Sequence, residues 1–150
     1  MTDYQSSGKL ACLSLFLGLN PCPPGKPMSP SHKILIMDND PDHLLFCTLV
    51  FQRRGFDVKS LAGCSPEEFR DVLEDFRPDL IFLEHEMRGI SGPEAVRMLR
   101  SEPKYAGIRV IYFSSEQDIV SLARKAGADG HLKKPFTIQR LMDMTNQFIP

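Results

Sequence analysis

Two hydrophobic patterns alternate along the chain from residue 33 onward. Short apolar runs bounded by Pro, Gly or Asp are typical of strands buried on both faces, and apolar residues three to four positions apart are typical of amphipathic helices. The runs lie at residues 33–37, 56–60, 80–83, 110–113 and 129–132, and a helical pattern follows each one. Five strand–helix units in succession predict an α/β, doubly wound fold with a five-stranded parallel sheet and five helices.

The helix boundaries carry capping signals. Asp40 followed by Pro41 predicts the N-terminus of the first helix, which ends near Gly55. The segment 65–68, Ser-Pro-Glu-Glu, is a capping box for the second helix, and Gly127 is placed to end the fourth. Apolar residues follow these signals at Leu44, Leu45, Leu49 and Phe51 in the first helix, and at Ile138, Leu141, Met142 and Phe148 on one expected face of the last.

The first 30 residues differ from the rest of the chain. The apolar run Leu10–Leu19 is too short to cross a bilayer, and the few charges before it and the lack of a cleavage motif argue against a secretory signal. Five prolines between Pro21 and Pro30 exclude a helix or strand there. We therefore expect a poorly ordered extension at 1–30 and a globular domain at 31–150. Because Met28 stands just before the first strand, residues 1–27 could also lie outside the native protein.

Composition narrows the classes of function. The chain has 150 residues, 42% of them hydrophobic and 25% charged, which fits one globular domain. A net charge of −1 gives no basic footprint, so neither nucleic acid nor a membrane surface is an expected partner. The four cysteines form no C-x-x-C pair, and we expect free thiols in a reducing, cytoplasmic setting, with Cys47 and Cys64 buried or at loop edges.

Polar side chains gather where the predicted strands end. In a parallel sheet of strand order 2-1-3-4-5, the carboxyl ends of the first, third, fourth and fifth strands lie side by side at one edge. The residues at these ends are Asp38 and Asn39, Glu84, Ser114 and Lys134. Carboxylate oxygens suit a divalent cation, and a hydroxyl with an ammonium group suits phosphoryl oxygens.

With these residues in place, residues 33–150 resemble the response-regulator receiver domain of two-component signalling. In that family two acids end the first strand, an Asp that accepts phosphate ends the third, Ser or Thr ends the fourth, and Lys-Pro follows the fifth. The resemblance places Glu84 at the phosphoacceptor position, Asp38 and Asn39 in the acidic pocket, Ser114, His131 and Lys134 at the switch positions, and Asp38, Glu84 and the Glu86 backbone carbonyl at a Mg²⁺ site.

Two departures from the family pattern change the expected chemistry. Glu84 stands where the family has Asp, and its extra methylene moves the carboxylate forward by about 1.5 Å into the space of a phosphoryl group. Asn39 stands where the family has a second acid, so a Mg²⁺ site would be weak and no cofactor is required. We therefore expect an atypical receiver that binds proteins and is not phosphorylated normally. It would not be an enzyme.

The resemblance also implies partners. A receiver domain meets a histidine kinase or a downstream effector. In the family the surface of the fourth helix, fifth strand and last helix commonly carries the signal, and the same surface would serve a homodimer.

Each candidate residue also has a structural interpretation. Glu84 either mimics a phosphoryl group, accepting hydrogen bonds from Lys134 and Ser114, or only fills the pocket as an ion pair with Lys134. Ser114 could simply cap the turn that follows it. Among the histidines, His131 is expected to be partly buried and His85 exposed and inert, and His43 shows no sign of a role.

Two other classes of function remain open at this point. Asp38-x-Asp40 resembles the nucleophile and acid–base pair of haloacid-dehalogenase-like phosphatases, although Pro41, Asp42 and the lack of a late acidic motif depart from that family. A flavodoxin-like nucleotide binder is less favoured, because the loop after the first strand is acidic and lacks donors for a phosphate.

Overall fold

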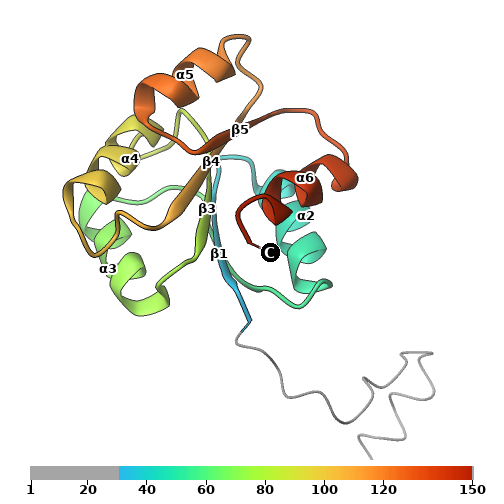
Figure 1. The fold of residues 1–150 in the computed structure, drawn as a ribbon, viewed down its shortest axis with the longest axis horizontal. Coiled ribbons are helices and arrows are strands. Elements are labelled where there is room, and N and C mark those ends of the chain that lie inside the picture. Colours follow the sequence, from blue (N-terminus) through green and yellow to red (C-terminus); the bar gives the residue numbers. More distant parts are fainter. Residues whose placement is uncertain (1–30, 150) are drawn as a thin grey trace, which may run out of the picture. The chain divides into compact units, whose positions relative to one another are not determined.

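The predicted α/β fold is confirmed. The computed structural model describes residues 31–149, and the expected extension at 1–30, with Cys12 and Cys22, lies outside the described residues. Five parallel strands form one sheet of order β2-β1-β3-β4-β5 (Figure 1). The strands are β1 (Lys33–Met37), β2 (Asp57–Leu61), β3 (Leu80–Leu83), β4 (Arg109–Ser114) and β5 (Gly130–Lys133).

Helices cover both faces of the sheet, as Figure 1 shows. Alternate strand residues point to opposite faces, so each of the inner strands contributes to two separate cores. Ile34, Phe82 and Phe113 face α2 and α6, whereas Leu35 and Tyr112 face α3, α4 and α5. The helices are α2 (Pro41–Gln52), α3 (Pro66–Phe76), α4 (Gly92–Ser101), α5 (Ile119–Ala126) and α6 (Ile138–Asn146).

The predicted helix caps are present. The Asp40 side chain accepts hydrogen bonds from the backbone amides of Asp42 and His43 at the start of α2. Ser65 and Glu68 form the predicted capping box at the start of α3. Gly127 ends α5 with φ of +84°, a left-handed conformation that glycine adopts without strain. These caps fix where each helix begins or ends relative to the sheet edge that carries the candidate site.

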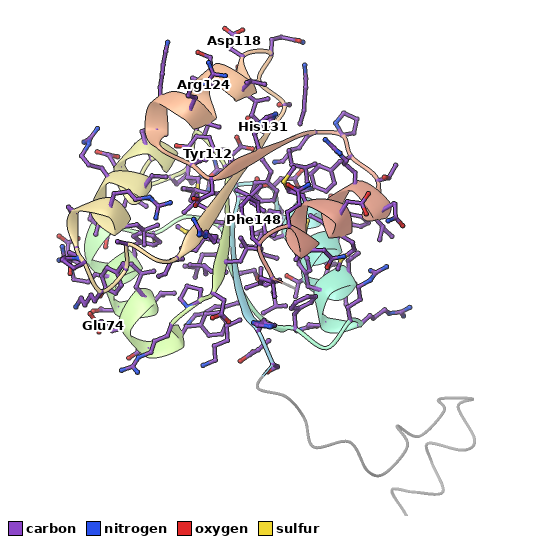
Figure 2. The ribbon with its side chains drawn as sticks, viewed as in Figure 1. Glu74, Tyr112, Asp118, Arg124, His131 and Phe148 are labelled. Carbon is purple, nitrogen blue, oxygen red and sulfur yellow. The ribbon has the colours of Figure 1, made fainter. Side chains whose placement is uncertain are left out.

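Two expectations about the apolar face of the last helix were wrong. Ile138, expected on the buried face of the last helix, is 41% exposed, and Phe148 lies beyond the end of α6 (Figure 2). In α2 the apolar residues divide between two faces, because Leu45 and Leu49 are 59% and 49% exposed while Phe51 is buried. None of the helices among residues 31–149 is long and apolar enough to cross a membrane.

Candidate functional site

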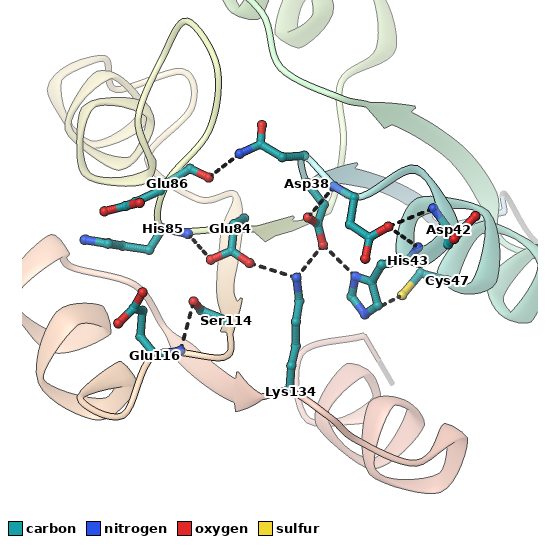
Figure 3. Close-up of polar contacts among 12 residues, drawn as sticks. Asp38, Asp42, His43, Cys47, Glu84, His85, Glu86, Ser114, Glu116 and Lys134 are labelled. Carbon is teal, nitrogen blue, oxygen red and sulfur yellow. Dashed lines mark hydrogen bonds and ion pairs between the residues drawn. The ribbon is translucent and has the colours of Figure 1, made fainter.

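Three of the predicted site residues meet at the carboxyl edge of the sheet. Asp38 follows β1, Glu84 follows β3 and Lys134 follows β5. The Lys134 ammonium lies 2.5 Å from Asp38 Oδ2 and 2.8 Å from Glu84 Oε2 (Figure 3). It also lies 4.8 Å from the centre of the Phe113 ring. The three polar side chains are between 3% and 17% exposed, so water screens their charges little.

Asp38 is the most heavily bonded member of this cluster. Its Oδ1 accepts the backbone amide of Asp40 at 3.0 Å, and its Oδ2 accepts from both Lys134 and His43. Burial alone would raise the pKa of Asp38, but the hydrogen bonds from His43, Lys134 and the Asp40 amide outweigh burial and lower the pKa to about 2. Asp38 is therefore a carboxylate at neutral pH.

Lys134 carries the matching positive charge. Burial would lower its pKa, but the hydrogen bonds to Asp38 and Glu84 outweigh burial and raise the pKa of Lys134 above its ordinary value. The second oxygen of Glu84 is also occupied, since Oε1 accepts the backbone amide of His85 at 2.8 Å. The pocket thus holds two carboxylates whose oxygens already have donors from the chain itself.

His43 is the residue that the sequence analysis missed. Its Nδ1 lies 2.6 Å from Asp38 Oδ2, and because Asp38 is ionised, Nδ1 carries the hydrogen and donates. Its ring packs against Phe113 and Phe136, with centroids 5.0 and 5.3 Å away. Its Nε2 lies 3.7 Å from Cys47 Sγ, but burial raises the pKa of Cys47 to about 12, so this cysteine is not a nucleophilic thiolate.

The Asn39 side chain bonds to the loop after β3 and makes no hydrogen bond to Asp38, Glu84 or Lys134. Its side-chain amide donates to the backbone carbonyl of Glu86 at 2.7 Å, and its side-chain oxygen accepts the backbone amide of Arg88 at 3.1 Å. Asn39 therefore ties the end of β1 to the loop after β3. In doing so it occupies the carbonyl that the resemblance assigned to a metal ion.

Ser114 does not bond to Glu84 either. It is 2% exposed, and its hydroxyl oxygen accepts the backbone amide of Glu116 at 3.3 Å. The structural interpretation of Ser114, as a cap for the turn after β4, is the one that the geometry supports. A phosphoryl mimic at Glu84 would keep the predicted contact to Lys134 and lack the predicted contact to Ser114.

The remaining histidines also differ from expectation. His131 is exposed on β5, beside α5, and was wrongly expected to be partly buried (Figure 2). His85 was expected to be exposed, but it is half-buried, and its ring centre lies 5.9 Å from that of Tyr112. Within residues 31–149, His85 Nδ1 and the Tyr112 hydroxyl are buried without a hydrogen-bond partner.

The residues of this pocket do not fit a Mg²⁺ ion. The oxygens of Asp38 and Glu84 accept from chain donors, and the Glu86 carbonyl accepts from Asn39. Across residues 31–149, no group of three or more His, Cys, Asp or Glu side chains is placed to hold a metal. Since Mg²⁺ requires several oxygen ligands in near-octahedral geometry, binding would require breaking these contacts.

The phosphatase alternative gains no support from this geometry. Asp40, which would be the acid–base residue, uses its carboxylate to accept the backbone amides of Asp42 and His43 at the start of α2. Asp38, which would be the nucleophile, is held by Lys134 and His43. Both oxygens of Asp38 and Oδ1 of Asp40 thus already accept hydrogen bonds from the chain itself.

The low pKa of Asp38 predicts an acid-dependent loss of stability. Its pKa is about 2 in the folded chain against an ordinary 3.8, so the unfolded chain takes up the proton first as pH falls. The stabilisation, about 2 kcal/mol, is complete above about pH 5 and is lost as pH falls toward 2. Urea denaturation at several pH values should show this loss in the wild type and a smaller one in Asp38→Asn. Parallel pH profiles for the two proteins would contradict the assignment.

Comparison with known proteins identifies the family. Residues 34–146 match the response regulator receiver domain family. The DNA-binding response regulator MtrA of Mycolicibacterium smegmatis is 29% identical over 112 residues, which are 73% of this chain and 47% of that protein. Protein RcaC of Microchaete diplosiphon is 32% identical over 106 residues, 69% of this chain and 16% of that protein. The chain thus spans less than half the length of these curated relatives.

Solved structures show the same fold. Chemotaxis protein CheY4 of Vibrio cholerae superposes with a TM-score of 0.69 at 21% identity, covering 79% of this chain and 99% of that one. The receiver domain of a sensor histidine kinase from Pseudomonas aeruginosa, with a magnesium ion coordinated in its active-site cleft, superposes with a TM-score of 0.70 at 20% identity. That match covers 79% of this chain and 98% of the kinase receiver domain.

Proposed function

The chain belongs to the response regulator receiver domain family of two-component signalling, and on that premise we propose that it is an atypical receiver that is not phosphorylated normally. It acts by binding another protein, a histidine kinase or a downstream effector, in the cytoplasm, and it catalyses no reaction of its own. The observation that carries the proposal is the Lys134 ammonium held between Asp38 and Glu84.

The contacts of the pocket favour this reading over normal phosphotransfer. An acyl phosphate forms only when the attacking oxygen is aligned with the phosphorus and the donor is bound in place. Glu84 places its carboxylate forward of the position that an Asp would occupy, and both of its oxygens are engaged. The chain therefore supplies internally the charges that phosphate and a metal ion would bring.

We propose that the partner binds the surface of α5, β5 and α6, and a path of contacts leads from the pocket to this surface. Lys134 follows β5 directly, and its neighbour Lys133 donates to the side chain of Gln117 in the loop after β4, at 2.8 Å. The Lys134 backbone amide also bonds to the Ser114 carbonyl at 2.9 Å. A groove of about 570 Å³ lies alongside, between β5 and the start of α6, and is lined in part by His131, Lys133 and Arg140. The ion pair at Glu84 thereby holds the loop after β4 and this groove in one arrangement.

Neutralising Glu84 tests whether the pocket sets the state of that surface. Glu84→Gln keeps the shape of the side chain and removes its charge, so Lys134 loses one of its two anionic partners. We expect backbone NMR signals of residues 114–118 and of His131 to move by more than their linewidths. Glu86→Gln is the matched control, because the Glu86 side chain is exposed in the same loop, and it should leave these signals unchanged.

The alternative to a signalling role is an inert pocket in which the pair only fills space. A shift between two loop positions requires a free-energy difference between them, which the charge of Glu84 would supply. If the signals of residues 114–118 stay in place in Glu84→Gln, then Glu84 is structural and the proposal is wrong on this point.

A further inference from the structure

Helix α2 carries most of the large hydrophobic side chains that are exposed in the described domain. Among residues 31–149 five large hydrophobic side chains are exposed, and three of them are in α2: Leu45 at 59%, Phe46 at 38% and Leu49 at 49%. The opposite face of the same helix packs into the core through Leu44 and Phe51, among others. Single exposed hydrophobic residues are ordinary, but three together on one helix face indicate a contact surface.

The exposed residues of α2 form a stripe with opposite charges at its two ends. Asp42, Leu45, Phe46, Leu49 and Arg53 follow the helical spacing i, i+3, i+4, i+7 and i+11, and they form what we call the α2 stripe. Arg53 keeps helical backbone angles, φ −62° and ψ −19°, so it continues the face. Neither Asp42 nor Arg53 forms an ion pair with any residue in the part of the chain that the structure describes.

We propose that the α2 stripe binds the α2 stripe of a second copy of this chain, with the two helices antiparallel. A twofold axis between Cys47 and Thr48 sets Phe46 of each copy against Leu49 of the other. The same axis sets Asp42 of each copy against Arg53 of the other. This inference concerns a different surface from the proposed function and does not depend on it.

Self-complementarity is the reason to choose a second copy as the occupant. A twofold interface brings the same patch together from both sides, so every attractive contact occurs twice and every repulsive one does too. In the α2 stripe the apolar residues lie at the centre, and acids and bases lie at opposite ends. Asp40 adds a second exposed negative charge next to Asp42, and Arg54 adds a second exposed positive charge next to Arg53.

A groove on the other surface considered for a homodimer, that of α5, β5 and α6, lacks this property. The groove beside β5 is lined by His131, Lys133 and Arg140 without an acidic side chain, so a twofold axis through it would place cations against cations. That groove suits a different, acidic partner better than a second copy.

The stripe also borders the candidate functional site. Phe46 forms part of a cavity of about 350 Å³ whose other lining residues include His43, Lys134 and Phe136. A second copy seated on Phe46 would lie at the edge of this cavity. Because one pair of short helices buries less than a standard interface of roughly 1,200–2,000 Å², we expect a weak, concentration-dependent dimer with a Kd in the micromolar to millimolar range.

Sedimentation velocity of the whole chain, from micromolar to millimolar concentration, tests the proposal. The wild type should shift from monomer toward dimer as concentration rises. Leu49→Glu should weaken association by at least about tenfold, since it puts an acid in an apolar contact that occurs twice. Val120→Glu is the matched control, because Val120 is a similarly exposed residue, 47%, on α5. A wild type that stays monomeric throughout, or a dimer lost in Val120→Glu and kept in Leu49→Glu, overturns the proposal.

Charge reversal tests the antiparallel register. Asp42→Arg alone and Arg53→Asp alone should each weaken self-association, because like charges then meet twice. An equimolar mixture of the two variants should associate again, since every cross-pair is once more an acid against a base. The charges of Asp42 and Arg53 also complement the dipole of α2 itself, but that effect cannot restore binding on mixing. Recovery further shows that both variants are folded, and a mixture that fails to associate overturns the register.

Discussion

Replacing Lys134 with Met should lower the free energy of unfolding by about 3 kcal/mol at neutral pH. Methionine keeps an unbranched apolar stem that is one atom shorter than the lysine side chain, and it removes the ammonium group. Asp38 and Glu84 would then lie close together, largely buried, without the cation that now contacts both of them. Breaking a buried ion pair from one side costs more than the pair itself contributes, because the remaining charges stay desolvated.

The neighbouring lysine provides the control for this measurement. Lys133 is exposed and contacts Gln117, so Lys133→Met should change the free energy of unfolding by no more than about 0.5 kcal/mol. Urea denaturation of the three proteins gives both numbers. If Lys134→Met were as stable as Lys133→Met, Lys134 would not be the group that holds the two carboxylates in the pocket.

The double variant Asn39→Asp with Glu84→Asp should gain phosphorylation, which we do not expect in the wild type. Asp at position 84 draws the carboxylate back by about 1.5 Å, which leaves room for a phosphoryl group and frees Lys134 to bind it. Asp at position 39 removes the amide that donates to the Glu86 carbonyl and adds an acid for Mg²⁺. With acetyl phosphate and Mg²⁺, intact-mass measurement should show a phosphoryl group on a major fraction of the double variant.

The single variants and a substitution of His43 separate the contributions of these residues to phosphorylation and to Mg²⁺ binding. Glu84→Asp alone should label weakly, since Asn39 still occupies the Glu86 carbonyl, and Asn39→Asp alone should not label. Adding His43→Leu to the double variant should tighten Mg²⁺ binding, because His43 no longer occupies Asp38 Oδ2. If the double variant failed to label while remaining folded, these two residues would not be what separates this pocket from a working one.

The strand ends could be placed from the sequence because the hydrophobic pattern fixes them. Continuous apolar runs locate β1 and β3, and parallel topology then brings Asp38, Glu84 and Lys134 to one edge, where the structure has them. The helix caps were predictable for a similar reason. Asp40 and Ser65 act within a few residues of themselves, so local sequence is enough to identify them.

The direction of individual side chains could not be predicted in the same way. Asn39 follows Asp38 in sequence, yet its side chain turns to the loop after β3, a contact between residues 47 positions apart. His43 reaches Asp38 only because the first turn of α2 folds back over the end of β1. A histidine one helical turn after a capping Asp that follows a strand end was the one signal in the sequence that could have suggested this contact.

The apolar residues of α2 show a second limit of prediction from the sequence. Leu45 and Leu49 fit a helical pattern as well as Leu44 and Phe51 do, but α2 is apolar on two faces, and only one of them can face the sheet. Helical spacing identifies a helix, but it does not say which of two apolar faces is buried. Ile138 was placed wrongly for a different reason. It is the first residue of α6, and helical spacing does not say how far toward the helix end the buried face extends.

The most direct test of the account uses the unmodified chain with acetyl phosphate and millimolar Mg²⁺. Intact mass reports phosphorylation, and backbone NMR signals of Asp38, Glu84 and Lys134 report entry of the metal ion. Because the pocket is already filled by Lys134, His43 and Asn39, we expect no added phosphoryl group and no saturable shift of these signals. A stable phosphoryl group located on Glu84, or saturable Mg²⁺ shifts at Asp38, would contradict the account.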